Sequence, residues 1–507
     1  MRTKASEHPN QHTPVSTPKE NHNIQTQIEP SSKVIMSTSI TIPLEKSSKI
    51  HAPAPKTVSF PNNSSLKHSL FLVTLFIFLL LFIQFKALES PLHFSWPLLG
   101  SQLSDQDITS MLRDSVTFLP LKDLRFSKEP ESGHTWFMSS VNDTFEPNES
   151  EYLYFPSNSS KGRLLCFSAH DPHDGAKNSY AFAWHEVLPH GAILLPGLTY
   201  VSDTYYDHSN LWHGLNAIAP FIAWNMRKGC VAPARWVLFH WGELRTEMGN
   251  WVNTIAEVAI GKAEIETFKG IEGPKCFEEA VVFRHNHGAM SEARVREVYD
   301  RIRCKAREFC KVEMDKIRDK KDVQMTLFLR TGARSFKNES VVVSVFEEEC
   351  RKAGNCRVKV EKTDNLSFCD QVRLMSETDI LVTPHGAQMT NILFMERNSS
   401  VMEFYPKGWE DLAGVGQYVY KWLSDWAGMR HQGVWRDPEG PPCPDPSDKL
   451  QCFFDFKDRQ IGHDPAYFST WASKVLQDMK EHRQAISVNG NDLSATRTNF
   501  CQCGTSV

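Results

Sequence analysis

Cysteine is absent from the first 165 residues of this 507-residue chain, and all twelve cysteines lie between Cys166 and Cys503. An even number of cysteines confined to one part of a chain, beyond an apolar segment, is typical of a compartment in which disulfides form. Zinc-ligand spacing is also lacking, because the Cys501-x-Cys503 pair has no second pair to match it. The sequence therefore predicts disulfides and argues against a zinc site.

Close spacing favours two disulfides in particular, which are Cys350 with Cys356 and Cys443 with Cys452. Cys304 and Cys310 lie six positions apart on a predicted helix, about 240° around its axis, so they are not expected to bridge each other. For any single cysteine, a buried free thiol is the alternative, because cysteine is among the residues most often buried.

The motifs of two common enzyme classes are missing as well. No G-x-S-x-G segment marks a hydrolase nucleophile, and no G-x-x-x-x-G-K-[ST] segment marks a phosphate loop of the kinase type. No internal repeat of solenoid length is visible. The net charge of −4 is distributed unevenly, since residues 1–68 hold eight Lys and Arg against four Glu and the remainder is acidic. Nucleic acid is therefore not expected as a partner of the folded part.

The N-terminal segments predict a membrane anchor. Residues 1–68 are rich in polar residues and Pro, and are expected to form a disordered cytosolic tail. Residues 69–85 are uncharged and lie between Lys67 and Lys86, so they predict a single transmembrane signal-anchor helix near the lower length limit. A buried core helix is the alternative, and a cleaved signal peptide is disfavoured because the preceding tail is too long.

Glycosylation sequons give the direction of insertion. N-x-[ST] triplets after the apolar segment predict a lumenal C-terminal part and hence type II topology, as does the basic tail. Single triplets arise by chance, and Asn62 and Asn63 match in the predicted tail too. The predicted glycosylation sites are Asn142, Asn148, Asn158, Asn338, Asn365 and Asn398.

After a predicted lumenal stem over residues 86–160, short apolar runs alternate with helical patterns. This alternation predicts an α/β fold with parallel sheets covered by helices on both faces, formed twice. We place an N-terminal Rossmann-like domain at 161–320, a C-terminal one at 321–460, and a final helix and tail at 461–507. The expected strands include 163–168, 192–195, 236–241, 280–283, 325–330, 357–360, 380–383 and 401–405.

The segment Asp370–Trp409 holds the most informative pattern. Its run of helix, strand, tight turn, helix and strand puts His385 and Gly386 where a strand ends and a helix begins. Free backbone N–H groups and the helix dipole at such a point favour a diphosphate, and a glycine lets it approach closely. Glu403, at the end of the next strand, is a candidate acceptor for ribose hydroxyls. An ordinary turn is the alternative on spacing alone.

The same segment resembles the signature of glycosyltransferase family 61, in which H-G-A-G-L-T-N precedes a strand ending in F-E. Here the residues read HGAQMTN (385–391) and MEF (402–404), so Gln388 replaces the usual glycine. The resemblance, which covers most of residues 163–480 in order, implies donor-binding roles. The residues concerned here are His385, Gly386, Ala387, Thr390, Asn391 and Glu403.

Two further segments resemble parts of that family. LFLRTGARSFKNES (327–340) matches a strand followed by basic residues, which implies that Arg330 and Arg334 lie near the donor phosphates. The alternative is a solvated charged loop.

SNLWHGLNAIAPF (209–221) resembles an N-x-x-H segment, which implies that Asn210 and Asn216 line the acceptor side and that His213 is the candidate general base. The family usually has an acid three or four positions after the histidine, where this chain has Asn216 and Ala217. A core histidine is the alternative for His213.

The resemblance implies a GT-B architecture in which an N-terminal acceptor domain faces a C-terminal donor-binding domain, both Rossmann-like, and in which the final helix crosses back to the first domain. It also implies inverting transfer from a UDP-sugar and no requirement for a divalent metal or other cofactor. The only Asp-x-Asp triplet, Asp105 to Asp107, lies in the predicted stem. The expected setting is the Golgi membrane, with a pentose such as xylose or arabinose moved to a cell-wall polysaccharide or glycoprotein glycan, and with other Golgi glycosyltransferases as further partners. The alternative is a noncatalytic lumenal glycan-binding or scaffold protein on the same fold.

Overall fold

The computed structural model describes residues 116–121, 141, 143–205, 210–240, 242–270, 272–287, 290–318, 321–488 and 501. All of these lie in one compact unit, Gly100–Val507. The predicted tail, the apolar segment 69–85, the triplet at Asp105 and the sequon at Asn142 lie outside the described residues. Across the described ranges, none of the helices combines the length and apolar character needed to cross a bilayer.

The first sheet has nine strands in a mixed arrangement. Its main path runs β1-β4-β3-β9-β5-β6-β7, with β2 paired to β9 and β8 paired to β6. The strands are β1 (Leu119–Pro120), β2 (Tyr152–Phe155), β3 (Leu164–Ser168), β4 (Ser179–Ala183), β5 (Ile193–Ser202), β6 (Arg235–His240), β7 (Glu243–Arg245), β8 (Glu264–Ile265) and β9 (Lys275–Phe283). The accompanying helices are η2 (Gly175–Lys177), α4 (Leu211–Arg227), α5 (Asn250–Ile260), α6 (Glu292–Phe309) and α7 (Met314–Arg318).

Two expectations for this part were wrong. Only the β5–β6, β5–β9 and β6–β8 pairs are parallel, whereas β3 pairs antiparallel with both β4 and β9. The connection from β3 to β4 is too short for a helical crossover, so the chain turns straight back. The predicted stem also ends earlier than residue 160, because β2 pairs with β9 and its Leu153 and Phe155 are buried in the sheet's core.

The second sheet is parallel throughout, as predicted, in the order β11-β10-β12-β13-β14. Its strands are β10 (Val323–Leu329), β11 (Cys356–Lys362), β12 (Ile380–Pro384), β13 (Ser400–Tyr405) and β14 (Arg430–Arg436). The helices are α8 (Glu339–Ala353), η3 (Thr363–Asn365), α9 (Phe368–Glu377), η4 (Ala387–Phe394), α10 (Trp409–Ala413), η5 (Gly414–Tyr418), α11 (Val419–Ala427), α12 (Lys449–Asp458) and α13 (Pro465–Val488).

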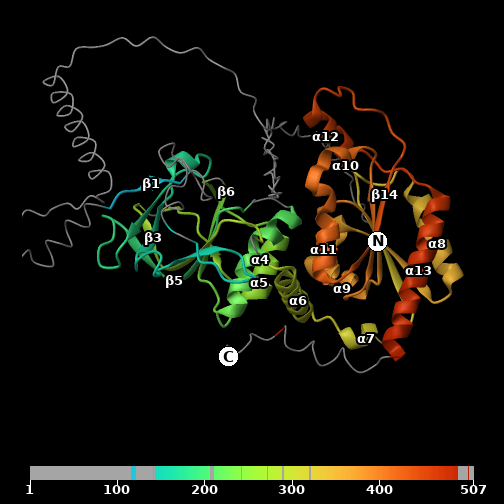
Figure 1. The fold of residues 1–507 in the computed structure, drawn as a ribbon, viewed down its shortest axis with the longest axis horizontal. Helices are drawn as coiled ribbons and strands as arrows, with labels where there is room; N and C mark the ends of the chain where they lie inside the picture. Colours follow the sequence, from blue (N-terminus) through green and yellow to red (C-terminus); the bar gives the residue numbers. More distant parts are fainter. Residues whose placement is uncertain are drawn as a thin grey trace, which may run out of the picture. The chain divides into compact units, whose positions relative to one another are not determined.

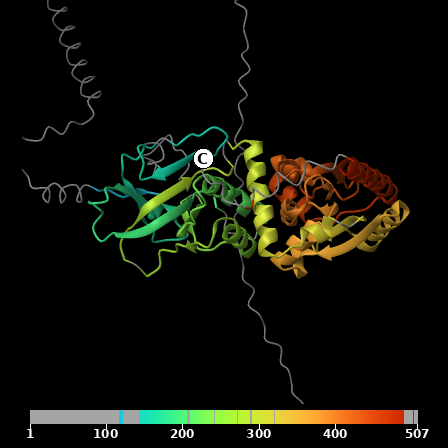
Figure 2. The ribbon, with the colours of Figure 1, turned by 90° about the horizontal axis from the view of Figure 1, so that it is seen from below.

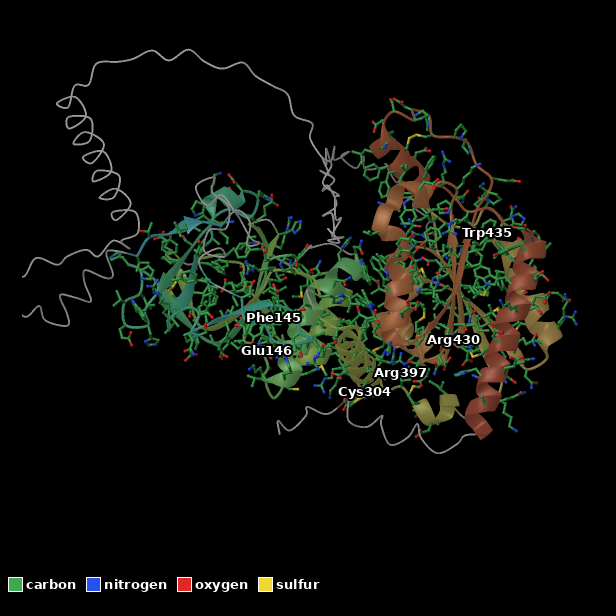
Figure 3. All side chains as sticks on the ribbon, in the orientation of Figure 1. Phe145, Glu146, Cys304, Arg397, Arg430 and Trp435 are labelled. Atoms are coloured by element: carbon green, nitrogen blue, oxygen red, sulfur yellow. A yellow bond between two sulfur atoms is a disulfide. The ribbon has the colours of Figure 1, made fainter. Side chains whose placement is uncertain are left out.

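Helices cover both faces of this sheet. Figure 1 shows α8 and α13 along one face, with α9, α10 and α11 on the other. The side chains follow the period of two expected of a strand, because Val382 points into the cluster beneath α8 and α13 while Leu381 joins the opposite cluster. Trp435 of β14, labelled in Figure 3, packs with its ring 4.8 Å from Phe468 of α13. A mixed α/β structure with two sheets is therefore confirmed.

The final helix packs differently from the expected crossing helix. Phe468, Val475 and Met479 of α13 all lie in the core of the second sheet, so the helix itself stays with that sheet. Beyond this helix, Cys501 forms a disulfide with Cys304 of α6. Helix α6 is the long yellow helix of Figure 2.

Disulfides link distant parts of the chain, as the cysteine distribution predicted. The two close pairs are confirmed, and Cys304 and Cys310 bond to other partners rather than to each other. The disulfides between described residues include Cys166–Cys276, Cys304–Cys501, Cys310–Cys369, Cys350–Cys356 and Cys443–Cys452.

Arginines of α6 hold the end of η4 in place. Arg303 donates to the carbonyl of Leu393 at 2.8 Å, and Arg307 donates to the carbonyl of Phe394 at 2.6 Å. These carbonyls belong to the last turn of η4, which has no partner of its own for them, so the guanidinium groups supply the missing donors. Arg397, which follows η4 and is labelled near Cys304 in Figure 3, forms an ion pair with Asp300 of α6. Helix α6 thereby fixes the C-terminal end of η4, whose N-terminal end follows Gly386.

Candidate active site

The junction of β12 and η4 forms the centre of the candidate site. Strand β12 is completely buried and ends at Pro384, and the backbone N–H of His385 still pairs with the carbonyl of Phe404 at 2.9 Å. Gly386 then has extended backbone and precedes the first turn of η4. The helix that the sequence predicted after Gly386 is present as a 3-10 helix. Ala387 is its first residue, so His385, Gly386 and Ala387 stand together at the carboxyl edge of the parallel sheet.

The space beside Gly386 is occupied by the ends of two flexible side chains. A β-carbon built there would lie 2.3 Å from Nη1 of Arg330 and 2.3 Å from Oε1 of Gln388. Arg330 follows β10 directly and donates to the carbonyl of His385 at 3.3 Å. Gln388, the residue that departs from the family pattern, folds back over the turn and donates to the carbonyl of Pro384 at 2.7 Å. The missing side chain at Gly386 therefore makes room for a guanidinium group against the turn.

Arg334 is the second cation of the cluster. Its backbone adopts φ +59°, and its N–H donates to the carbonyl of Arg459 at 2.8 Å, so the loop is fixed by pairing with a distant segment. Its guanidinium lies 5.8 Å from the ring centre of Trp409. Burial, reinforced by the nearby charge of Arg330, lowers the pKa of Arg334 to about 10, and burial likewise lowers the pKa of Arg330.

Among the described residues, these two guanidinium groups form no ion pair with a carboxylate, and the Nε of each is buried without a hydrogen-bond acceptor. Asp458 is near enough to act against the lowering of the pKa of both arginines, and Asp364 acts in the same way on Arg330, but burial outweighs these charges. Lys457 of α12 adds a third basic group to the cluster. Burial, together with the nearby charge of Arg334, lowers the pKa of Lys457. Buried cations without counter-ions are costly, and in proteins they usually mark the place of an anionic ligand. The cluster is suited to bind a diphosphate.

His385 is held by a buried carboxylate. Its Nδ1–H donates to Oε1 of Glu403 at 2.5 Å, and Nε2–H of His431 on β14 donates to Oε2 of the same carboxylate at 2.8 Å. Burial alone would raise the pKa of Glu403, but the bonds from the two histidines hold it at about 2. Glu403 is therefore an anion with both oxygens occupied, and it fixes the ring of His385.

Aromatic rings enclose the imidazole of His385. Its centre lies 4.4 Å from Trp409, 4.8 Å from Tyr405 and 4.9 Å from Tyr420, and the residue is 5% exposed. Burial lowers the pKa of His385, although its bond to Glu403 acts in the opposite direction. With Nδ1 committed to the carboxylate, Nε2 is the ring atom left to meet a ligand. The histidine is thus both a packing residue and a candidate ligand contact.

The remaining residues of the motif act within the protein. Thr390 is completely buried, and Asn391 accepts from the indole Nε1 of Trp251 on α5 at 3.0 Å while donating to the carbonyl of Gln388. Asn391 therefore connects η4 to the helices of the first sheet. Their predicted donor-binding roles stay predictions, and the contacts of Asn391 described above are structural ones.

The predicted acceptor-side residues lie at the start of α4. Asn210 caps the helix by accepting from the backbone N–H of Trp212 at 3.1 Å, and Asn216 donates to the carbonyl of Trp212 at 2.7 Å. His213 is partly exposed in the first turn. The ring of its neighbour Trp212 lies 5.9 Å from Tyr420, which in turn contacts His385. The beginning of α4 is therefore connected to His385 through the rings of Trp212 and Tyr420.

Sequence reasoning missed three contributors to this site. His431 lies on a strand with no apolar alternation, and Lys457 lies in a segment with no recognised pattern. Trp409 is the last residue of the motif segment, and no sequence pattern indicates a role for it. The one signal available was composition, since aromatic and basic residues recur between residues 405 and 459. In the part of the chain that the structure describes, no group of three or more His, Cys, Asp or Glu side chains is placed to hold a metal ion.

Four of the predicted glycosylation sites can be placed with their exposure. The side chains of Asn148, Asn158, Asn338 and Asn398 are exposed, as attachment of a glycan requires. Their glycosylation stays a prediction.

Comparisons with known proteins agree with the motif. The family model described as Glycosyltransferase 61 matches residues 195–402, a range that includes α4, Arg330, Arg334 and His385. Protein O-linked-mannose beta-1,4-N-acetylglucosaminyltransferase 2 of Xenopus tropicalis is 33% identical over 140 residues, which cover 26% of this chain and 23% of that protein. The Homo sapiens and Mus musculus proteins of the same name are each 34% identical over 113 residues, covering 22% of this chain and 18% of theirs.

The chain thus matches about a fifth of the length of these curated relatives. Among solved structures, rubredoxin oxygen:oxidoreductase from Desulfovibrio gigas aligns with 63% of this chain and 66% of its own at 11% identity, with a TM-score of 0.21 that carries no information on fold. The family match and the named relatives support a role in glycosyl transfer. The resemblance predicted from HGAQMTN is confirmed by the match of the family model to residues 195–402, which include that motif.

Proposed function

We propose that this protein is an inverting glycosyltransferase of GT-B type that uses a UDP-sugar as donor and a glycan or glycoprotein hydroxyl as acceptor. The observation that carries the proposal is the pair of partly buried arginines, Arg330 and Arg334, which form no ion pair with a carboxylate among the described residues. Arg330 also lies against Gly386. A diphosphate would supply the negative charge that this cluster lacks.

In this mechanism the acceptor oxygen attacks the anomeric carbon on the side opposite UDP. The bond from that carbon to the diphosphate oxygen breaks, and negative charge grows on the leaving UDP. Arg330 and Arg334 stabilise that charge, with Nε2 of His385 and Lys457 as further contacts. Glu403 acts by holding His385 in orientation, since both of its oxygens are already bonded to histidines, and we assign it no ribose contact.

Removal of the acceptor proton needs a base, for which we propose His213. Its place in the first turn of α4, next to Trp212 and partly exposed, supports this role. The position where relatives have an acid is occupied by Ala217, which is 2% exposed, and by Asn216, whose amide bonds to a backbone carbonyl. This departure favours the second candidate, a noncatalytic glycan-binding or scaffold protein that retains the donor site.

For the setting and the donor sugar, we propose a single-pass type II protein of the Golgi membrane that moves a pentose, such as xylose or arabinose, to a cell-wall or glycoprotein glycan without a divalent metal. The curated relatives carry names that specify N-acetylglucosamine transfer to O-linked mannose, so UDP-N-acetylglucosamine is the competing donor.

Release of free UDP tests the proposal. The purified protein is incubated with UDP-xylose, UDP-arabinose, UDP-N-acetylglucosamine and UDP-glucose, each with and without chelator and with mixed neutral oligosaccharides. We expect acceptor-dependent release from one donor. If the protein binds UDP but releases UDP from none of the donors, the noncatalytic candidate is favoured. If the protein does not bind UDP, both the enzyme and the noncatalytic protein with a retained donor site are rejected.

A further inference from the structure

A row of aromatic side chains lies along one side of α11 and continues onto α4. Tyr418, Trp422 and Trp426 are spaced by four residues, so their side chains share one face of the helical segment. Tyr418 is 45% exposed and Trp422 is 36% exposed. The ring centres of Tyr418 and Trp422 lie 6.1 Å apart, and those of Trp422 and Trp426 lie 6.2 Å apart. Trp212 of α4 stacks on Trp426, with ring centres 6.4 Å apart and an interplanar angle of 10°. We call these four residues the aromatic row.

Tyr418 and Trp422, the exposed members of the aromatic row, do not attach α11 to the protein, whereas Trp426 and Trp212 lie partly buried against the hydrophobic core. The opposite side of the helix is buried through Tyr420, Leu423 and Ala427, which belong to the main hydrophobic core. Exposed neighbouring aromatic rings in water are unfavourable, and contiguous patches of this kind usually mark a binding surface. The outward rings therefore call for a ligand rather than for a structural explanation.

The aromatic row lies near the candidate donor site. The ring of Trp212 lies 5.9 Å from that of Tyr420, and Tyr420 lies 4.9 Å from His385. Tyr420 and His385 are 3% and 5% exposed, so these contacts join the row to the donor site through the core of the protein. His213, our proposed base, follows Trp212 directly in the sequence.

The charges around the aromatic row are already paired, which favours a neutral ligand. Lys421 and Asp425 of α11 form an ion pair with each other at 2.5 Å. Arg296 donates to the backbone carbonyls of Asp425 and Trp426. The surface thus offers flat apolar rings without free charge of either sign from these groups. Pyranose rings present a face of C–H groups with partial positive charge, which complements the negative face of an indole.

We propose that the aromatic row binds the acceptor as a neutral carbohydrate chain, with successive sugar rings stacked on Trp422, Trp426 and Trp212. The acceptor class is then a glycan of at least two or three sugars rather than a bare polypeptide. The inference rests on the proposed function for its orientation toward the donor, but the binding itself requires no catalysis.

The test is binding of neutral oligosaccharides to the intact protein. Xylo-, arabino- and manno-oligosaccharides of four to six sugars are immobilised and also titrated by calorimetry, with saturating UDP present. Trp422→Ala and Tyr418→Ala should each lower the affinity roughly three- to tenfold, as expected for loss of one stacked ring, and Trp422→Phe should retain part of it. The matched controls are Trp184→Ala and Tyr467→Ala, which remove rings that are 37% and 47% exposed elsewhere on the protein.

Two results would overturn the inference. One is that none of these oligosaccharides binds the wild-type protein, and the other is that the α11 variants bind as tightly as the controls. Loss of binding to an unglycosylated polypeptide in the α11 variants, with oligosaccharide binding unchanged, would reassign the surface to a protein partner. UDP affinity is measured on every variant. Oligosaccharide binding that survives while UDP fails to bind would leave this inference standing and reject the proposed donor site.

Discussion

Replacing Arg334 with glycine separates the stability of the protein from its proposed ligand binding. Arg334 adopts φ +59°, a conformation that costs a residue with a β-carbon about 1 kcal/mol and costs glycine nothing. Its partly buried guanidinium, whose pKa burial lowers to about 10, also carries an unneutralised charge. We therefore expect Arg334→Gly to leave the folded protein intact.

The magnitude follows from four contributions. Relief of the backbone strain contributes about 1 kcal/mol, and removal of the desolvated charge roughly 1 to 3 kcal/mol. Against these stand the lost contact with Trp409, worth about 0.5 to 1 kcal/mol, and the greater chain entropy of glycine when unfolded, about 0.5 to 1 kcal/mol. The free energy of unfolding should therefore stay the same or rise by up to about 3 kcal/mol, which corresponds to several degrees in Tm at most.

In contrast to stability, the affinity of the Arg334→Gly protein for UDP should fall. Loss of one charge-assisted hydrogen bond to phosphate costs about 1.5 to 3 kcal/mol, or roughly ten- to hundredfold in affinity. Thermal melts and calorimetric titration with UDP measure the two effects on the same preparation. Lys311→Gly is the matched control, because Lys311 is exposed at φ +53° just after α6 and should show the backbone effect alone. An Arg334→Gly protein that melts at the wild-type temperature and binds UDP as tightly as wild type would refute the reasoning.

Three further perturbations have defined outcomes. His385→Ala should weaken UDP binding at least tenfold and also lower Tm, because the ring packs among aromatic side chains and its loss leaves Glu403 with one fewer donor; a melt beside a titration shows both. Gly386→Ala should displace the ends of the Arg330 and Gln388 side chains rather than the backbone, so we expect weaker UDP binding with a Tm change below about 3 °C, and normal affinity would argue against this geometry. Acid should destabilise the protein as pH falls from about 4.5 toward 2, since the pKa of Glu403 is about 2 when folded against an ordinary value of 4.5, and protonation in the unfolded chain comes first. Denaturant titrations of Glu403→Gln across that range should show a shallower loss of stability than wild type.

The second sheet and its central turn could be read from the sequence. The strands around 325–330, 380–383 and 401–405 are short, apolar and rich in branched residues, and each has a helix after it, so type and order follow from the pattern alone. Pro384, His385 and Gly386 mark the turn because a proline and a glycine interrupt these patterns at a strand end.

The first sheet and the charge network could not be read in this way. Strands β2 and β4 are only four and five residues long, so nothing distinguished them from the predicted stem and a loop. Glu403 meets His431 because β13 and β14 lie side by side with His431 opposite Val401, which is a property of the sheet and not of either segment. Disulfides such as Cys166–Cys276 depend on the same long-range pairing.

The central claim is that Arg330 and Arg334 bind the diphosphate of a nucleotide sugar. Calorimetric titrations of UDP and of uridine into the wild-type protein and into an Arg330→Gln, Arg334→Gln double variant test it directly. The account predicts that UDP binds the wild type at least about a hundredfold more tightly than uridine, as two charge-assisted contacts require, and that the double variant removes most of that difference. Equal affinity of the wild type for UDP and uridine, or an undiminished preference for UDP in the folded double variant, would contradict it.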